Sequence, residues 1–352
     1  MLECEFGKRK SDNPDEIKMK IGVQAGMIFF VLQLLTACRI YPKVESYQDQ
    51  KLEQAEMRPY VFQDGSLQIH YWEGGNLEGE PLVFLHGFGG DAAWTWARNF
   101  PDFSEKYHII APDLLWFGES EIKLDNSAVA QTEYDSAPSL QIQVDAIQLL
   151  LEQKKIDSTN IIGLSYGGFV GMELSKIFPV DSLILVGVGG WQFSEQEVAA
   201  LTDRFAVEHL EEIFVPETKE GTRILIDICF HAPVYLVPRQ FSDDLYGTVF
   251  GKYPEQQAEL LRELIRNQYY YRENEASYQA AQTLIILGET DPLFTVEQAK
   301  ELSEILKGEL LVYGNADHTP SFEYRRKFGN DVNQFLDKRE GTASAVKGNK
   351  NE

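Results

Sequence analysis

A serine flanked by glycines, in the stretch GLSYG (163–167), lies where an apolar run gives way to a helical pattern. A serine hydroxyl is a poor nucleophile unless a base removes its proton and a carboxylate orients that base. The pattern G-x-S-x-G between a strand and a helix is typical of a nucleophile elbow, a sharp turn that lifts the hydroxyl clear of a sheet. Such a turn strains the backbone and needs neighbours without bulk, which Gly163 and Gly167 provide. The spacing therefore predicts Ser165 as a nucleophile for acyl transfer.

The base and the acid are expected farther along the chain, because this arrangement places them in the order serine, acid, histidine. Of the six histidines, His318 is the one beyond the last pair of predicted strands, in the loop GNADHTP. Asp291 follows the apolar run TLIILG and lies at the carboxyl end of that strand. Asp317, adjacent to His318, is a weaker candidate for the acid. Singly, His318 fits a surface loop and Asp291 an Asp-Pro turn, but their order and positions favour catalysis.

Acyl transfer also requires N–H donors for the oxyanion that develops on the substrate carbonyl. The backbone N–H of Tyr166, the residue after the serine, is one expected donor. The other is expected from the glycine-rich loop HGFGG (86–90), where the backbone N–H of Phe88 is the candidate. His86 is expected to brace this loop and not to take part in catalysis.

The elements that must position these residues alternate between strands and helices. Two short apolar segments at residues 60–62 and 67–72, split by Asp64-Gly65, predict an antiparallel hairpin. Six continuous apolar runs predict strands buried on both faces, at residues 81–86, 108–112, 160–164, 182–188, 283–288 and 309–314. Helical patterns occupy residues 140–151, 169–178, 296–306 and 322–336. The alternation predicts an α/β fold with a mostly parallel eight-stranded sheet flanked by helices, and residues 189–282 predict a helical cap inserted after the sixth strand.

Composition and charge narrow the function classes. The 352 residues, of which 43% are hydrophobic, suffice for one large folded domain with an insertion. The 55 acidic residues against 32 basic ones give a net charge of −23, which argues against binding of nucleic acids. Cys4, Cys38 and Cys229 lie far apart and form no CxxC pair, so neither a disulfide framework nor a metal site is indicated. No organic cofactor is expected either, and Cys229 is expected to be a buried free thiol.

The amino terminus has the features of an export signal. Residues 19–38 contain a lysine, an apolar stretch and then small residues. The stretch Leu35-Thr36-Ala37-Cys38 resembles the lipobox of bacterial lipoproteins, in which the thiol of the cysteine is acylated before cleavage. We therefore expect a signal peptide at residues 1–37, starting at Met1 or Met19, and a lipid on Cys38 that anchors the protein to a membrane of the bacterial cell envelope. An uncleaved anchor and cleaved soluble export are the alternatives.

Two further segments are assigned from their composition. Residues 38–58 are mostly polar and charged, so they are expected to form a tether between the lipid anchor and the folded part. Residues 339–352 have no apolar pattern and predict a disordered tail.

Five motifs together resemble the successive signatures of the α/β-hydrolase family: HGFGG (86–90), APDLLWFGES (111–120), GLSYGG (163–168), LGETDPLF (287–294) and NADH (315–318). The resemblance covers residues 60–337. It implies a core of residues 59–188 and 283–338, with residues 189–282 as the cap, and is closest to esterases and monoacylglycerol lipases. Leu164 and Trp116 stand where the family often has a polar residue and a glycine, which leaves the substrate subclass open.

The implied activity is hydrolysis of carboxylic esters through an acyl-enzyme, with acylglycerols or medium-chain esters as substrates. Apolar residues between 224 and 241 of the cap are expected to serve packing and, in part, an acyl-chain site. Carbon–carbon bond hydrolases and proline aminopeptidases share the same set of catalytic residues and remain alternatives. A non-catalytic ligand-binding relative of the hydrolases is a third possibility.

Overall fold

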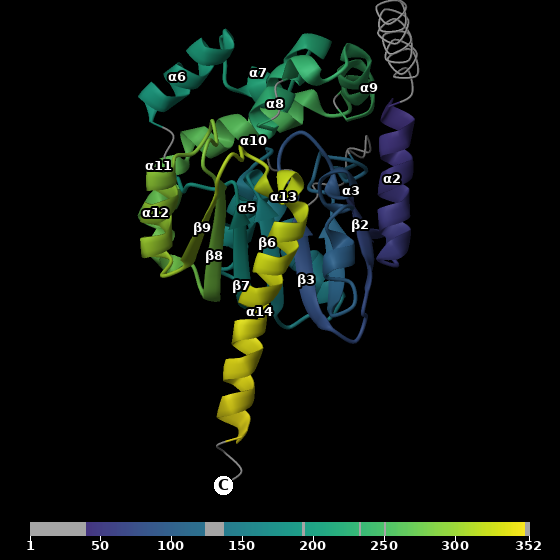
Figure 1. Ribbon diagram of the computed structural model, residues 1–352, viewed down its shortest axis with the longest axis vertical. Coiled ribbons are helices and arrows are strands. Elements are labelled where there is room, and N and C mark those ends of the chain that lie inside the picture. Colours follow the sequence, from purple (N-terminus) through teal and green to yellow (C-terminus); the bar gives the residue numbers. More distant parts are fainter. Residues whose placement is uncertain (1–39, 124–136, 192–193, 232–233, 250, 349–352) are drawn as a thin grey trace, which may run out of the picture.

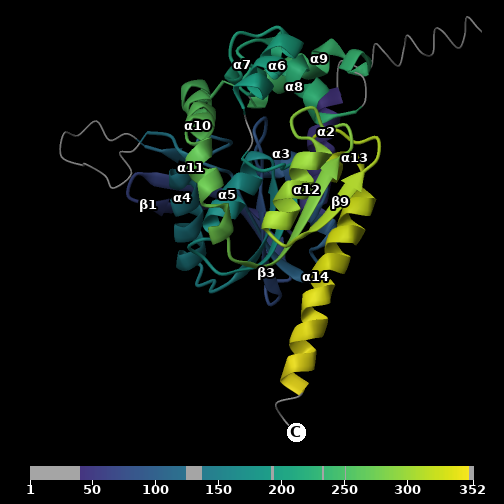
Figure 2. The ribbon, with the colours of Figure 1, turned by 90° about the vertical axis from the view of Figure 1, so that its left-hand side faces the viewer.

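The computed structural model describes residues 40–123, 137–191, 194–231, 234–249 and 251–348 (Figures 1 and 2). The expected signal peptide and Cys38 lie outside these residues. No helix in the described ranges is both long enough and apolar enough to cross a membrane.

The described residues form a nine-stranded sheet with the order β1-β2-β4-β3-β6-β7-β8-β9, and β5 pairs with β2. The strands from β4 through β9 in this order are parallel, whereas β1, β2 and β5 pair in antiparallel fashion. This arrangement confirms the predicted mostly parallel sheet, and the two-residue β5 is the strand that the sequence did not predict. The strands are β1 (Arg58–Asp64), β2 (Leu67–Gly75), β3 (Glu80–Leu85), β4 (Tyr107–Pro112), β5 (Glu121–Ile122), β6 (Thr159–Leu164), β7 (Val180–Val186), β8 (Ala280–Gly288) and β9 (Glu309–Tyr313).

Helices cover both faces of the sheet, so the central strands are buried on both sides. On one face, Val83 and Leu85 of β3 pack in a cluster with residues of α4, α5 and α12. On the other face, Leu82 and Phe84 pack in a second cluster with residues of α3 and α14. This alternation is the period-two pattern of a strand. The helices are α3 (Ala92–Trp96), α4 (Leu140–Gln153), α5 (Tyr166–Leu174), α12 (Val296–Ile305), α13 (Pro320–Glu323) and α14 (Arg325–Gly348), with the short η2 (Phe100–Asp102).

The segment between β7 and β8 is helical, as the sequence predicted, and lies over the carboxyl ends of the strands (Figure 1). Because ligands of open parallel sheets bind beyond this edge, the segment covers the place where a site is expected. It consists of α6 (Glu195–Phe205), α7 (Glu211–Phe214), α8 (Lys219–Cys229), η3 (Val234–Leu236), α9 (Arg239–Val249), α10 (Pro254–Arg266), α11 (Gln268–Glu273) and η4 (Glu275–Ser277). We refer to these elements as the cap.

The prediction of a tether at residues 38–58 is wrong over most of its length. Residues 40–54 form helix α2 (Ile40–Gln54), which contacts α3, η2 and α9. Its carboxyl end is anchored by Leu52, and the following Ala55 and Met57 are also buried. The polar composition of the segment was misleading because only these few apolar side chains bury one end of the helix against the core.

The prediction of a disordered tail from residue 339 is also wrong for residues 339–348. Helix α14 runs to Gly348. Its first turns are fixed by Phe328, Val332 and Phe335, which pack against the sheet. Once these turns have formed, each added residue gains a hydrogen bond at a small further entropic cost, so the helix extends beyond its packed part.

We predict that Leu52→Ala lowers the free energy of unfolding by about 2–5 kcal/mol, because it removes a buried side chain from the anchor of α2. The exposed neighbour Glu53 provides a control. Glu53→Ala should change the free energy of unfolding by no more than about 0.5 kcal/mol. Urea unfolding of the two variants measures the difference. Equal midpoints would mean that α2 is not packed as described.

Candidate active site

Ser165 occupies a strained turn between β6 and α5. Its backbone has φ 51° and ψ −117°, outside the conformations that residues with side chains usually adopt. The flanking glycines allow the close approaches that the turn requires. A Cβ on Gly163 would lie 2.6 Å from the Gly167 oxygen, and a Cβ on Gly167 would lie 2.5 Å from the oxygen of His86. The turn therefore tolerates no side chain at either position, as expected of a nucleophile elbow.

The structure brings together the predicted base and acid. The Nδ1 atom of His318 lies 2.9 Å from Oδ2 of Asp291, and both side chains are at least 95% buried. The other carboxylate oxygen of Asp291 accepts the backbone N–H groups of Leu293 at 2.8 Å and Phe294 at 3.2 Å. These bonds fix the carboxylate, so it can hold the imidazole in one orientation with Nε2 left for another partner.

His318 and Ser165 lie beside the same strand end. The Ser165 N–H donates to the oxygen of Val186, the last residue of β7, at 2.8 Å. The next residue, Gly187, has φ +60°, and a Cβ there would lie 2.6 Å from the His318 oxygen and 3.1 Å from its ring. The histidine loop therefore packs directly against the end of the strand that supports the serine turn.

The loop HGFGG (86–90) passes next to the serine. A Cβ on Gly87 would lie 3.2 Å from the Cβ of Ser165. Among the residues that the structure describes, the backbone N–H groups of Phe88 and Tyr166 donate to no acceptor. Two unpaired donors that flank a serine are the groups that an oxyanion hole requires.

His86 braces this loop, as the sequence indicated. Its Nδ1–H donates to the Gly87 oxygen at 2.8 Å, and its Nε2 accepts the Leu114 N–H at 2.9 Å. Burial lowers the pKa of His86, so the ring stays neutral and can serve as both donor and acceptor. The ring thereby links the loop after β3 to the loop after β4.

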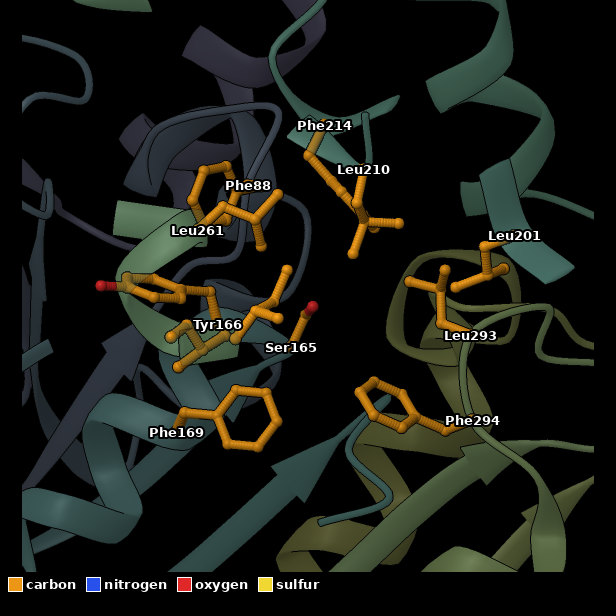
Figure 3. A pocket seen from close by; sticks show the side chains of 12 residues that line it. Phe88, Ser165, Tyr166, Phe169, Leu201, Leu210, Phe214, Leu261, Leu293 and Phe294 are labelled. Carbon is orange, nitrogen blue, oxygen red and sulfur yellow. The ribbon is translucent and has the colours of Figure 1, made fainter. Parts of the chain in front are cut away.

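The hydroxyl of Ser165 points into a small apolar cavity (Figure 3). The cavity has a volume of about 40 Å³, room for only about two or three waters. Within the described ranges, no group of three His, Cys, Asp or Glu side chains could hold a metal ion. Apart from Ser165, the cavity is lined by Phe88, Tyr166, Phe169, Leu201, Leu210, Phe214, Leu261, Leu264, Ile265, Leu293 and Phe294.

Sequence reasoning missed a polar network behind the HGFGG loop. Asp113 accepts the Ala92 N–H at 3.0 Å, the Glu119 N–H at 3.2 Å and a bond from Nδ1 of His70 at 2.8 Å. Burial lowers the pKa of His70, but the bond to Asp113 and its charge outweigh burial, so the pKa lies above its usual value. Burial and the charge of Asp113 raise the pKa of Asp91 to about 7. Asp113 and Glu119 lie in the APDLLWFGES motif, but Ala92 and His70 are 21 and 43 residues away from Asp113, so spacing alone gave no sign of them.

A second set of contacts that the sequence did not reveal joins the cap to the histidine loop. The N–H and hydroxyl of Thr319 both donate to the Cys229 oxygen, at 3.2 and 2.5 Å. The N–H groups of His231 and Asp317 both donate to the Glu323 carboxylate at 2.9 Å. Nδ1 of His231 also lies 3.1 Å from the Asp317 carboxylate. We call these five residues the clasp.

The clasp explains two features of the site. The Asp317 carboxylate contacts His231 and the Thr290 hydroxyl. The carboxylate that contacts Nδ1 of His318 is instead that of Asp291. Burial raises the pKa of Glu323. The clasp residues flank His318, so their hydrogen bonds connect the cap to the loop that carries this histidine.

Trp116 and Leu164 are the two residues that depart from the usual family motifs, and the structure shows the surroundings of both. Trp116 has φ +66°, a conformation that favours glycine, and its oxygen accepts the side-chain N–H of Gln257 in the cap at 2.7 Å. Leu164 is buried below the serine turn. The backbone at Trp116 therefore contacts the cap in a conformation that is strained for a residue with a side chain.

Comparison with known proteins finds hydrolases among the proteins that resemble this chain. The chain is 27% identical to 2-hydroxymuconate semialdehyde hydrolase of Pseudomonas sp., over 76% of this chain and 90% of the relative. It is 24% identical to Lipase 3 of Moraxella sp., over 84% of this chain and 89% of the lipase. The crystal structure of a protein assigned as a lipase from Acinetobacter baumannii has the same fold, with a TM-score of 0.71, 24% identity and coverage of 85% and 97% of the two chains.

The family model for the alpha/beta hydrolase fold matches residues 80–324, which include Ser165, Asp291 and His318. The match covers more than half of the chain and takes in both the core strands from β3 onward and the whole cap. The protein therefore belongs to the α/β-hydrolase family.

Proposed function

We propose that the protein is a serine hydrolase that cleaves carboxylic esters of acylglycerol or medium-chain type through an acyl-enzyme. The observation that carries the proposal is the conjunction at one sheet edge of the strained Ser165 turn with the buried His318–Asp291 pair. The lipase relative supports an ester substrate.

In the proposed acylation step, Ser165 Oγ attacks the ester carbonyl while Nε2 of His318 takes the serine proton. Asp291, bonded to Nδ1, stabilises the imidazolium. The N–H groups of Phe88 and Tyr166 bind the oxyanion. His318 then gives its proton to the leaving alcohol, and the acyl group remains on Ser165.

In the second step, water attacks the acyl-enzyme and His318 takes a proton from it. The bond between Ser165 Oγ and the acyl carbon breaks, His318 returns a proton to the serine, and the carboxylic acid leaves. The step requires water alone, so the reaction is balanced without a cofactor.

The lining of the small cavity favours an ester over the alternatives. Ser165 and Tyr166 are its two polar residues, and the Tyr166 hydroxyl points away from the serine (Figure 3). A proline aminopeptidase needs a carboxylate for the substrate amine, and a carbon–carbon bond hydrolase with an anionic substrate needs a cation. The lining supplies neither.

Carbon–carbon bond hydrolysis is nevertheless the second candidate, because the 2-hydroxymuconate semialdehyde hydrolase relative has 27% identity over 76% of this chain. A panel that contains p-nitrophenyl esters and a ring-cleavage dienoate separates the two functions. We expect turnover of the esters and none of the dienoate. The reverse result would favour the second candidate.

We predict that Ser165→Ala lowers kcat for p-nitrophenyl butyrate at least about 10⁴-fold, because the nucleophile is lost. Ser277→Ala, at an exposed position of the cap, is the control and should retain activity. Unchanged turnover in Ser165→Ala would end the assignment of the nucleophile. Loss of all turnover and of fluorophosphonate labelling in the wild-type chain as well would favour a non-catalytic relative.

Two neighbouring carboxylates allow a matched test of the acid. We predict that Asp291→Asn lowers kcat about 10³–10⁴-fold, because it no longer stabilises the imidazolium. Asp317→Asn alters the contacts with His231 and Thr290 and leaves the Asp291–His318 pair in place, so its effect should stay below about tenfold. A larger loss of kcat in Asp317→Asn than in Asp291→Asn would mean that Asp317, and not Asp291, is the acid.

We also propose that Cys38 carries a lipid that holds the protein at a membrane of the bacterial cell envelope. The lipobox-like stretch at residues 35–38 supports this, and helix α2 starts at Ile40, two residues after the cysteine. The remaining link between the lipid and the folded part would thus be short.

For this proposal we predict that Cys38→Ser moves the protein from the membrane fraction to the soluble fraction of cells. Cys229→Ser, in the cap, is the matched control and should stay in the membrane fraction. A Cys38→Ser protein that remains membrane-bound and is processed at the same place would show that lipidation is not the anchor.

A further inference from the structure

A second cavity, of about 740 Å³, lies on the α2 side of the cap. Its walls come from α2, α3, α8, α9 and α13, and α2 contacts both α3 and α9 (Figure 1). The volume falls within the range of about 300–1,000 Å³ typical of small-molecule sites. Helix α2 precedes the residues that match the family model.

The cavity reaches the immediate neighbours of the proposed catalytic residues. Leu164, which precedes Ser165, and Thr319, which follows His318, both line it. Phe88 lines this cavity and the small cavity above Ser165. Phe88 therefore borders both spaces.

The walls are mostly apolar and suit a hydrocarbon chain. Trp94 and Phe241 stack with their ring centroids 6.5 Å apart, which joins α3 to the cap. Burial of a hydrocarbon chain against such side chains is favourable in proportion to the apolar area removed from water. The apolar wall residues are Val44, Leu225, Ile226, Phe230, Val237, Phe241, Leu245, Trp94 and Phe322.

One cationic side chain in this wall lacks an anionic partner. The Arg98 guanidinium lies 3.9 Å from the centroid of the Phe322 ring and 5.8 Å from that of Tyr47. Its Nε atom is buried and makes no hydrogen bond. Within the described ranges Arg98 forms no ion pair, although acidic residues outnumber basic ones by 55 to 32. A positive charge without an anionic partner at the wall of an apolar cavity favours an anionic ligand.

The other charged groups of the wall do not fill this role. Glu323 lines the cavity, but its two oxygens accept the N–H groups of His231 and Asp317 in the clasp. Lys43 of α2 is exposed and adds a second positive charge to the wall. The net charge offered to a ligand is therefore positive on the side of Arg98.

We propose that this cavity binds a long-chain fatty acid, with its carboxylate on Arg98 and its alkyl chain along the apolar walls toward Phe88. A carboxylate matches the charge of the guanidinium, and an unbranched chain matches an apolar cavity of this size. Such an acid has the same chemistry as the product of the proposed ester hydrolysis. The inference rests on the cavity and not on Ser165, so it stands whether or not the proposed function holds.

The test uses the full chain with Ser165→Ala, which separates binding from hydrolysis. The probe is cis-parinaric acid, a fluorescent long-chain fatty acid, titrated into the protein. We expect saturable binding that palmitate displaces. Adding Arg98→Gln should weaken binding of the acid about tenfold or more, because a charge-assisted bond is lost, while competition by hexadecanol should be unchanged.

Two further variants serve as controls. One removes a guanidinium outside the cavity, and the other fills the cavity itself. Arg204→Gln removes a guanidinium that also lies over a phenylalanine ring, at 5.1 Å, but outside the cavity, so binding should not change. Val237→Trp should fill the cavity and reduce binding of both acid and alcohol, with circular dichroism used to verify folding. Absence of saturable binding, or equal binding by the Arg98→Gln and Val237→Trp variants, would overturn the proposal. Stronger displacement by lysophosphatidylcholine than by palmitate would identify a phospholipid site in its place.

Discussion

The left-handed backbone of Ser165 is the constraint on which the rest of the site depends. Residues with a side chain rarely adopt it, and its cost is about 1–3 kcal/mol. It persists because β6 and α5 on either side are buried along their whole length. The first turn of α5 leaves no space for a Cβ at Gly163, and the end of β3 leaves none at Gly167. Core packing, and not local preference, thus holds the hydroxyl above the sheet edge.

Signals within single elements predicted much of the fold and of the candidate site. The apolar runs predicted every parallel strand, because a strand buried on both faces must be apolar throughout. The edge strand β9 was also predicted from its apolar run, but it is partly exposed. The carboxyl ends of these same strands also predicted the positions of Ser165, Asp291 and His318. Asp291 and His318, which form a buried contact, were each predicted from the strand that precedes them.

Features that depend on contacts between distant segments could not be predicted in this way. Helix α2 is mostly polar, and only the few residues near Leu52 reveal that it packs. The continuation of α14 depends on its packed first turns rather than on the residues beyond 338. The Asp113 network and the clasp each include side chains that bond to groups far away in sequence, and such bonds leave no periodic signature.

The clasp and the two cavities together describe how the cap relates to the chemistry. The clasp ties the end of α8 to the loop that carries His318, so displacement of that end would also displace the histidine. The space directly above Ser165 is small, whereas the larger space lies behind Phe88 on the α2 side. Phe88 lines both spaces, and the cap contributes residues to the walls of both.

The central claim is that Ser165 is the residue that carries the acyl group. Rapid acid quench of the wild-type chain during turnover of p-nitrophenyl butyrate, followed by peptide mass spectrometry, tests it most directly. The account predicts a butyryl mass increment on the peptide that contains Ser165, localised to that serine by fragmentation. Turnover that proceeds without any increment, or with the increment on a different residue, would contradict it.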